Sequence, residues 1–172
     1  MRQGFFKPAL LLVGILICSD SLFAADMAFS GELIDPACSL GKDRISVNLG
    51  RVYEQYLYKN QRTPGTLFEL SLNNCNITQI NKVKIKFDGT RNSALTEYLV
   101  VTGSTVRGVA IGLETPAGQA LPLGSSAEYS LQPGDNVIKL NAYIRGEPNA
   151  LINKAIRPGA FSALATFTLE YF

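Results

Sequence analysis

The 172 residues of this sequence include three cysteines and no histidine. The candidates for reactive side chains are therefore the cysteines and the acidic residues. The lack of His excludes Ser-His-Asp and Cys-His nucleophile systems and His-based metal sites. Asp88, Glu97 and Glu114 remain as candidate acid–base carboxylates, but their spacing singles out no pair. No glycine-rich phosphate loop follows a strand and opens a helix. We therefore predict a non-enzyme without a cofactor or a metal site.

The N-terminus has the layout of a secretory signal. A basic start precedes an apolar run at 9–18 that is too short to span a membrane, and the following segment 19–25 ends in small residues. We expect cleavage of residues 1–24 and export of the remainder. A lipoprotein signal with Cys18 as the lipidated residue is the rival interpretation. It fits poorly, because Ile17 stands where a small residue is required.

Cys38 and Cys75 remain after cleavage, in a compartment that oxidises thiols. Two cysteines in that setting predict one disulfide, with a pair of buried free thiols as the alternative. A bridge closing a loop of this length should stabilise the fold by roughly 4 kcal/mol in the chain-entropy model. The net charge of the whole chain is only +2, and no basic run indicates nucleic-acid binding.

The mature sequence reads as β-structure throughout. Period-two alternation of apolar residues predicts strands at 45–49, 68–72, 82–87, 109–113, 137–144 and 160–172. Turn signals lie at 88–89, 116–118 and 133–136. The polar stretch 145–158 is predicted to hold a loop or a short helical turn. About seven strands, without an internal repeat, favour one β-sandwich domain.

The two ends of the mature chain are both apolar on one face. At the start, the residues on this face are Met27, Phe29, Gly31 and Leu33. Gly31 in a strand interior indicates a close approach by another group, or a β-bulge. At the end, the residues on one face are Phe161, Ala163, Ala165, Phe167, Leu169 and Tyr171. If the sandwich ends with this strand, a sheet edge and a hydrophobic groove stay open.

Several segments together resemble pilins of the chaperone–usher pathway. The opening 25–38 is similar to the start of mature pilins, above all the minor tip subunits of P-pilus-like fimbriae. Cys75 follows an Asn-Asn pair as in that family, and Gly159 with the penultimate Tyr171 resembles its chaperone-recognition motif. The segment 165–171 looks like its last strand.

The resemblance implies an incomplete immunoglobulin-like β-sandwich that lacks its last strand. It divides the chain into a signal peptide at 1–24, a donor-strand extension at 25–36 and a pilin domain at 37–172. A periplasmic chaperone would lend a strand to the groove. At the outer-membrane usher, the extension of a neighbouring subunit would replace it, which is strand addition as a mode of recognition.

The resemblance also assigns roles to residues. Met27, Phe29, Gly31 and Leu33 would form the donor strand. Chaperone and groove contacts would come from Gly159, Phe161, Phe167, Leu169, Tyr171 and Phe172. Of these, Phe172 would anchor its terminal carboxylate on basic residues of the chaperone.

We expect the protein to be a structural subunit of a surface fimbria, with the position of a minor tip or adaptor subunit. A pilus terminator and a major rod subunit remain alternatives, as does a self-complemented secreted immunoglobulin-like binding module. A tip adhesin fits less well, because such proteins carry a further lectin domain and no donor extension. Tyr53, Tyr56 and Tyr58 are candidates for a binding surface, for packing at the sandwich edge or for contact with a neighbouring subunit.

Overall fold

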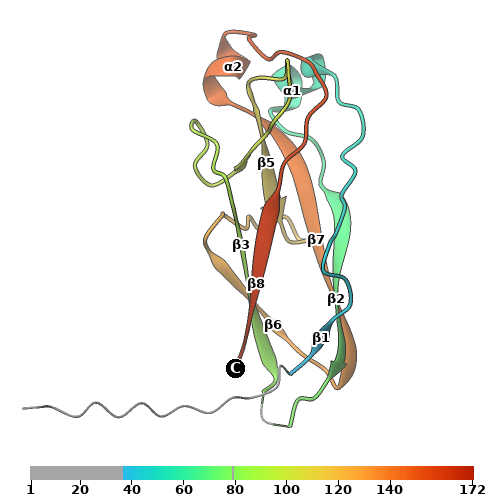
Figure 1. The fold of residues 1–172 in the computed structure, drawn as a ribbon. Coiled ribbons are helices and arrows are strands. Elements are labelled where there is room, and N and C mark those ends of the chain that lie inside the picture. Colours follow the sequence, from blue (N-terminus) through green and yellow to red (C-terminus); the bar gives the residue numbers. More distant parts are fainter. Residues whose placement is uncertain (1–36, 79) are drawn as a thin grey trace, which may run out of the picture. The chain divides into compact units, whose positions relative to one another are not determined.

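Two antiparallel β-sheets form the fold in the computed structural model, which describes residues 37–78 and 80–172 (Figure 1). The strands are β1 (Ser39–Leu40), β2 (Thr66–Cys75), β3 (Lys82–Gly89), β4 (Leu99–Val100), β5 (Val109–Glu114), β6 (Ser126–Ser130), β7 (Gly134–Gly146) and β8 (Ala165–Tyr171). The helices are α1 (Glu54–Asn60) and α2 (Pro148–Ile152). The predicted all-β class is confirmed.

The larger sheet has the strand order β1-β2-β7-β5-β4, and the smaller sheet has the order β6-β3-β8. The longest strand, β7, pairs with β2 on one side and with β5 on the other. In the smaller sheet β3 is central, and β8 pairs with it from Val83↔Tyr171 to Gly89↔Ala165. The C-terminal strand is therefore an edge strand.

The core lies between the sheets and follows the predicted alternation. Its most deeply buried side chains are Leu70, Leu72, Val83, Ile85 and Leu140. They come from β2, β3 and β7, so both sheets supply the apolar face that period-two patterning requires. The lysines of β3 alternate with its buried residues and leave the other face of the small sheet in contact with water.

A second, smaller apolar cluster lies where α1 and α2 meet the loop before β5 (Figure 1). Its buried members are Leu57, Val106, Val109, Ile144, Ala150 and Ile156. The hydroxyl of Tyr58 accepts a hydrogen bond from the Ile156 amide at 3.1 Å, which ties α1 to the chain after α2. The short helices are thus held by packing, since isolated helices of this length are unstable in water.

Three expectations differ from the structure or are refined by it. The segment 45–49 alternates in burial as predicted, yet it belongs to no sheet. Helix α1 and strand β6 were not expected. Within 145–158, the short-helix alternative is correct, because Pro148 opens α2 at a position that needs no amide donor.

The predicted turn at 133–136 is only partly correct, because Pro133 lies in a bend and β7 already begins at Gly134. Gly134 has a φ of +86°, a conformation that glycine adopts without steric cost. The side chain of Asn136 closes the turn by accepting from the Gln132 amide and donating to the Gln132 carbonyl, both at 2.8 Å.

The predicted signal peptide and donor strand (residues 1–36) lie outside the described residues. Neither described helix is long and apolar enough to cross a membrane.

Candidate strand-binding groove

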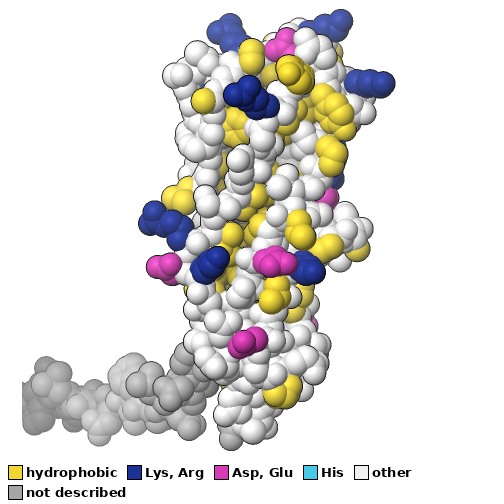
Figure 2. Space-filling model, turned by 90° about the vertical axis from the view of Figure 1, so that its right-hand side faces the viewer, with side chains coloured by type: hydrophobic (Ala, Val, Ile, Leu, Met, Phe, Trp, Pro, Cys, Tyr) yellow, Lys and Arg dark blue, Asp and Glu magenta, His cyan; other side chains and the backbone are white. Residues whose placement is uncertain are grey.

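An apolar groove of about 1210 Å³ runs between the edges of the two sheets. One wall is the extended segment 43–53, and the other is the segment 159–167 that leads into and begins β8. Its floor consists of side chains from both sheets, namely Phe68, Phe87, Leu99, Ile111, Leu113 and Ala142. Hydrophobic surface is gathered along this face of the domain (Figure 2). Phe68 is half-buried and the other floor side chains are at most 8% exposed, so the groove lies directly over the core of the sandwich.

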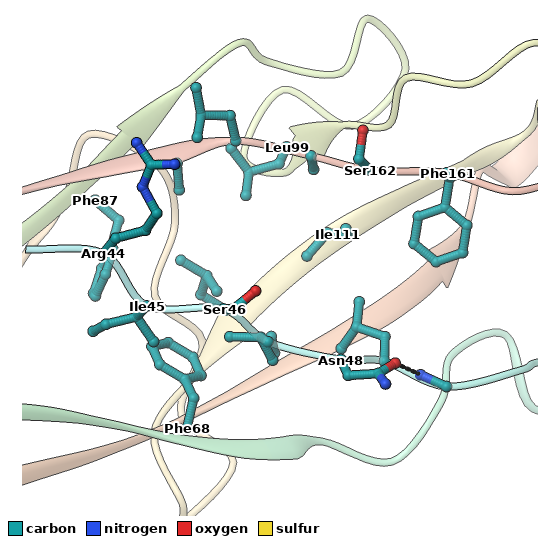
Figure 3. A pocket seen from close by; sticks show the side chains of 18 of the residues that line it. Arg44, Ile45, Ser46, Asn48, Phe68, Phe87, Leu99, Ile111, Phe161 and Ser162 are labelled. Carbon is teal, nitrogen blue, oxygen red and sulfur yellow. Dashed lines mark hydrogen bonds between the residues drawn. The ribbon is translucent and has the colours of Figure 1, made fainter.

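The first wall has the side-chain pattern of a strand without a strand's pairing. Ile45, Val47 and Leu49 are half-buried against the core, whereas the residues between them are exposed. Figure 3 shows Ile45 beside Phe68 and Phe87 at the groove floor. Within the described residues, no amide or carbonyl from Arg44 to Val52 makes a backbone hydrogen bond. Apart from the Gly50 amide, which donates to the Asn48 Oδ1 at 2.9 Å, these groups remain available to an added strand.

The second wall offers a free sheet edge. Strand β8 pairs only with β3 within the described part of the chain, so its other edge faces the groove. The side chains of Ala163, Ala165 and Phe167 are half-buried against the core, and Leu164 between them is 82% exposed. Two unpaired backbone edges therefore face one apolar groove, which is the geometry that a missing strand would leave.

Gly159 stands where the second wall begins, and its backbone lies close to the loop before β5. A Cβ at this position would collide with the Thr105 Oγ1 and would lie 2.9 Å from the Val106 amide nitrogen. The Thr105 hydroxyl also donates to the Pro158 carbonyl at 3.0 Å, which fixes the approach. The glycine therefore sets the direction in which the chain enters β8.

The structure separates the six predicted groove residues into two groups. Gly159, Phe161 and Phe167 line the groove. Leu169 and Tyr171 are half-buried against the core farther along β8, outside the groove lining. Burial raises the pKa of the Tyr171 phenol above its ordinary value.

Phe172 is the remaining predicted residue, and it lies at the outer edge of the small sheet. Phe172 is 41% exposed, and the Lys84 Nζ lies 4.4 Å from the centroid of its ring. Its backbone pairs with Lys82 in both directions, at 3.1 and 3.2 Å. The terminal carboxylate is in no ion pair with a described residue.

The predicted disulfide between Cys38 and Cys75 is present. It joins the residue before β1 to the last residue of β2, and both cysteines are buried. Because β1 leads into the unpaired wall 43–53, the bridge holds one end of that wall against the large sheet.

A partly buried ion pair lies on the outer face of the large sheet, away from the groove lining. The guanidinium of Arg62 donates to both oxygens of Glu114, at 2.7 and 2.9 Å, and Glu114 is 4% exposed. The same guanidinium lies 3.6 Å from the ring centroid of Tyr143, whose hydroxyl donates to that of Tyr98 at 3.3 Å. Glu114, a candidate acid in the sequence, is thus fully engaged in a structural contact.

The sequence did not reveal the groove floor or the helix α1 that follows the first wall. The floor residues appear in the sequence only as inward positions of predicted strands. Alternation of apolar residues does not show whether a core position lies in a closed sandwich or beneath an open groove.

The three candidate tyrosines differ in exposure. Tyr53, before α1, and Tyr56, in α1, are exposed, whereas Tyr58 packs against the small core cluster. No cluster of His, Cys, Asp or Glu suited to a metal ion occurs among the described residues.

A two-sheet sandwich that is open along one edge defines an incomplete immunoglobulin-like domain of the pilin class. The chain belongs to the fimbrial protein family, whose model, described as "Fimbrial protein", matches residues 27–172. It is a fimbrial subunit of the chaperone–usher type.

Individual relatives agree with this assignment. The chain is 32% identical to the fimbrial adapter PapK of Escherichia coli, over 95% of this chain and 96% of the relative. It is 30% identical to the major MR/P fimbria protein of Proteus mirabilis, over 96% and 97%. The crystal structure of the P pilus rod subunit PapA is similar with a TM-score of 0.68 and 26% identity, covering 80% of this chain and all of that one.

Proposed function

We propose that this subunit polymerises by strand donation, accepting a strand in its groove and donating its own residues 27–33 to a neighbour. The observation that carries the proposal is a pair of backbone edges, 44–52 and one side of β8, on the two sides of the apolar groove; both are unpaired within residues 37–78 and 80–172. An added strand would satisfy both edges and cover the floor. Each buried apolar side chain contributes roughly 1.5–3 kcal/mol, and each ladder hydrogen bond about 1 kcal/mol.

A periplasmic chaperone would fill the groove first, and the outer-membrane usher would be the place of exchange. The terminal carboxylate of Phe172, free of ion pairs with described residues, supports a basic anchoring site on the chaperone. Purification without the chaperone tests the open groove. We expect poor yield or aggregation, because the apolar wall side chains are only half-buried and the two backbone edges are unpaired among the described residues. A stable monomer in good yield would contradict this step.

Within the fibre we propose a minor adaptor position. The 32% identity to a fimbrial adapter over most of the chain supports it. The similarity to a major fimbria protein keeps the rod subunit as a second candidate. Quantitative mass spectrometry of purified fimbriae separates them, since an adaptor is present in a few copies per fibre and a rod subunit dominates. The open groove favours a subunit that accepts a strand over a terminator.

The donor half of the proposal is tested at Gly31. Gly31→Leu should leave the complex with the chaperone intact and block joining to the neighbour, because a large side chain cannot enter a shallow pocket of the partner groove. Ser30→Leu is the matched control, since period-two alternation places that side chain on the opposite face. Polymer formation is measured as a heat-dissociable ladder on gels. A normal rate for Gly31→Leu would overturn the pocket assignment.

A further inference from the structure

We propose that the helical end of the domain is a docking surface for the body of the subunit that donates the strand. This surface comprises α1, α2 and the loops 101–108 and 153–158, together with Arg51 and Tyr53 at the groove mouth. The inference rests on the proposed function and adds a second contact to it, outside the groove. The partner surface would carry carboxylates around an apolar centre.

The direction of strand insertion places the donor body at this end. The two walls run in opposite directions (Figure 1), so an added strand is antiparallel to one of them and parallel to the other. We infer that it runs antiparallel to β8, because β8 is the regular strand of the two and antiparallel ladders are slightly more stable per residue. Strand β8 starts after Gly159, beside the helical end, and finishes at the opposite end of the small sheet (Figure 1). The added strand would then leave the groove near Gly159. Since the donor strand precedes the rest of its own chain, the donor domain begins there.

Large apolar side chains are exposed at the helical end. Tyr53 and Ile152 are each 78% exposed, and Tyr56 is 43% exposed. They belong to the two helices and the residue before α1, and their buried neighbours Leu57 and Ala150 fix those helices on the small core cluster. Because Tyr53 also lines the groove, the exposed apolar surface is continuous with it. Tyrosine is enriched in protein interfaces for this combination of apolar area and a polar tip.

The helical end is also positively charged. Its exposed cations are Arg51, Lys59, Arg107, Lys154 and Arg157. None of them makes an ion pair with a described residue. The acidic residues there are Glu54 and Glu147, both half-buried, and Glu147 accepts a hydrogen bond from Asn92 at 2.7 Å. The charge excess selects a partner with carboxylates and guides its approach.

The surface is preformed, because its parts are joined by hydrogen bonds. Arg107 and Arg157 exchange two backbone hydrogen bonds of 3.1 Å, which link the two loops. The Tyr58 hydroxyl accepts from the Ile156 amide and links α1 to the second loop. A partner therefore meets a fixed arrangement of Tyr56, Ile152 and the cations, and the ordering cost of binding is small.

Photo-crosslinking in assembled fimbriae tests the docking surface. The residue p-benzoylphenylalanine replaces Tyr56 or Ile152 in the full-length chain, and adducts are identified by mass spectrometry. The same replacement at Phe161, in the groove, reports which subunit donates the strand. Leu67, which is 53% exposed on β2, serves as the control outside the helical end. We expect the Tyr56 and Ile152 variants to capture the folded domain of the subunit whose extension is captured at Phe161.

The outcomes separate the two proposals. If Phe161 captures a neighbour's extension but neither Tyr56 nor Ile152 captures that neighbour's domain, the docking surface is wrong and strand donation stands. If Tyr56 and Ile152 capture the usher or an acidic cell-surface polysaccharide instead, the docking surface is also wrong. If Phe161 captures no extension, strand donation itself fails.

A charge-reversal arm tests the chemistry of the partner. Combining Lys59→Glu and Lys154→Glu should lower the yield of the Tyr56 adduct by up to about tenfold, the sum of a few exposed ion pairs. Lys139→Glu with Lys86→Glu applies the same change in charge to the outer sheet faces. The control pair should leave the adduct unchanged. An equal effect of both pairs would overturn the acidic-partner assignment.

Discussion

Gly159 shows how one residue without a side chain controls the entrance to the groove. Its backbone lies against Thr105 and the Val106 amide, so a methyl group there must displace one of them. Gly159→Ala should therefore lower the free energy of unfolding by about 1–3 kcal/mol, the usual cost of overpacking. Urea unfolding of the purified subunit with its groove filled by a donor-strand peptide measures this.

A double-mutant cycle assigns that cost to the contact. Because Thr105→Ala removes the hydroxyl that a Cβ at position 159 would meet, the double variant should lose less stability than the sum of the single variants. Strict additivity would show that the close approach is not the reason for glycine at this position.

The ion pair of Arg62 and Glu114 is the strongest charge contact among the described residues. Removing one charge leaves the other unsatisfied in a largely buried site, and Arg62 keeps about a third of its side chain in water. We therefore expect Glu114→Gln to cost about 1–3 kcal/mol, less than a fully buried pair. The control is Glu128→Gln, whose partner Lys84 lies 4.0 Å away in an exposed pair. Thermal unfolding should separate the two variants clearly, and equal effects would contradict this account.

The phenol of Tyr143 should make the folded domain less stable at alkaline pH. Burial, and then the hydrogen bond to Tyr98, raises the pKa of its phenol above the ordinary value of 10.0. Above about pH 10 the unfolded state releases this proton while the native state keeps it, so the free energy of unfolding falls as pH rises. Tyr143→Phe should make that fall less steep. Urea unfolding between about pH 8 and about pH 11 measures the slope, and an unchanged slope would contradict the assignment.

At the scale of elements, the wall 43–53 is a strand that lacks its ladder. We expect amides from 44 to 52 to exchange hydrogen rapidly in a subunit with an empty groove, because none has a backbone partner among the described residues. Binding of a donor-strand peptide should protect part of this segment and the free edge of β8. Amides of β7, already paired on both sides, serve as the internal control. Protection confined to β8 would show that the added strand does not bridge the two walls.

Most strands could be predicted from the sequence, because alternation reports which side chains reach the core. It identified β2, β3, β5, β7 and β8, and the half-buried row Ile45, Val47 and Leu49. Alternation does not report backbone pairing, so it predicted a strand where the structure has only an extended wall.

The helix α1 escaped prediction for a different physical reason. It is only 7 residues long, its N-cap residue Tyr53 makes no capping hydrogen bond, and Leu57 is its one buried residue. Tertiary packing on the small core cluster stabilises it, and no local signal announces that packing. The groove residues Phe161 and Phe167 were predictable only together with the resemblance to pilins, because the same pattern fits a closed sandwich.

For the whole molecule, the disulfide and the groove are parts of one arrangement. The bridge from Cys38 to Cys75 fixes the start of one groove wall, and Gly159 fixes the start of the other. The groove between them is lined by apolar side chains of both sheets. In the proposed mechanism the groove is the acceptor half of a polymer contact, and the donor half precedes residue 37 in the chain.

The central claim is that the strand at 27–33 enters a different molecule. Placing p-benzoylphenylalanine at Phe29 and irradiating assembled fimbriae tests it most directly. We predict an adduct with the groove of a neighbouring subunit, migrating on a denaturing gel, after heating, as a species larger than the monomer. An adduct of monomer size, joining position 29 to the segment 43–53 or to β8 of the same chain, would show that the domain completes itself and would contradict the account.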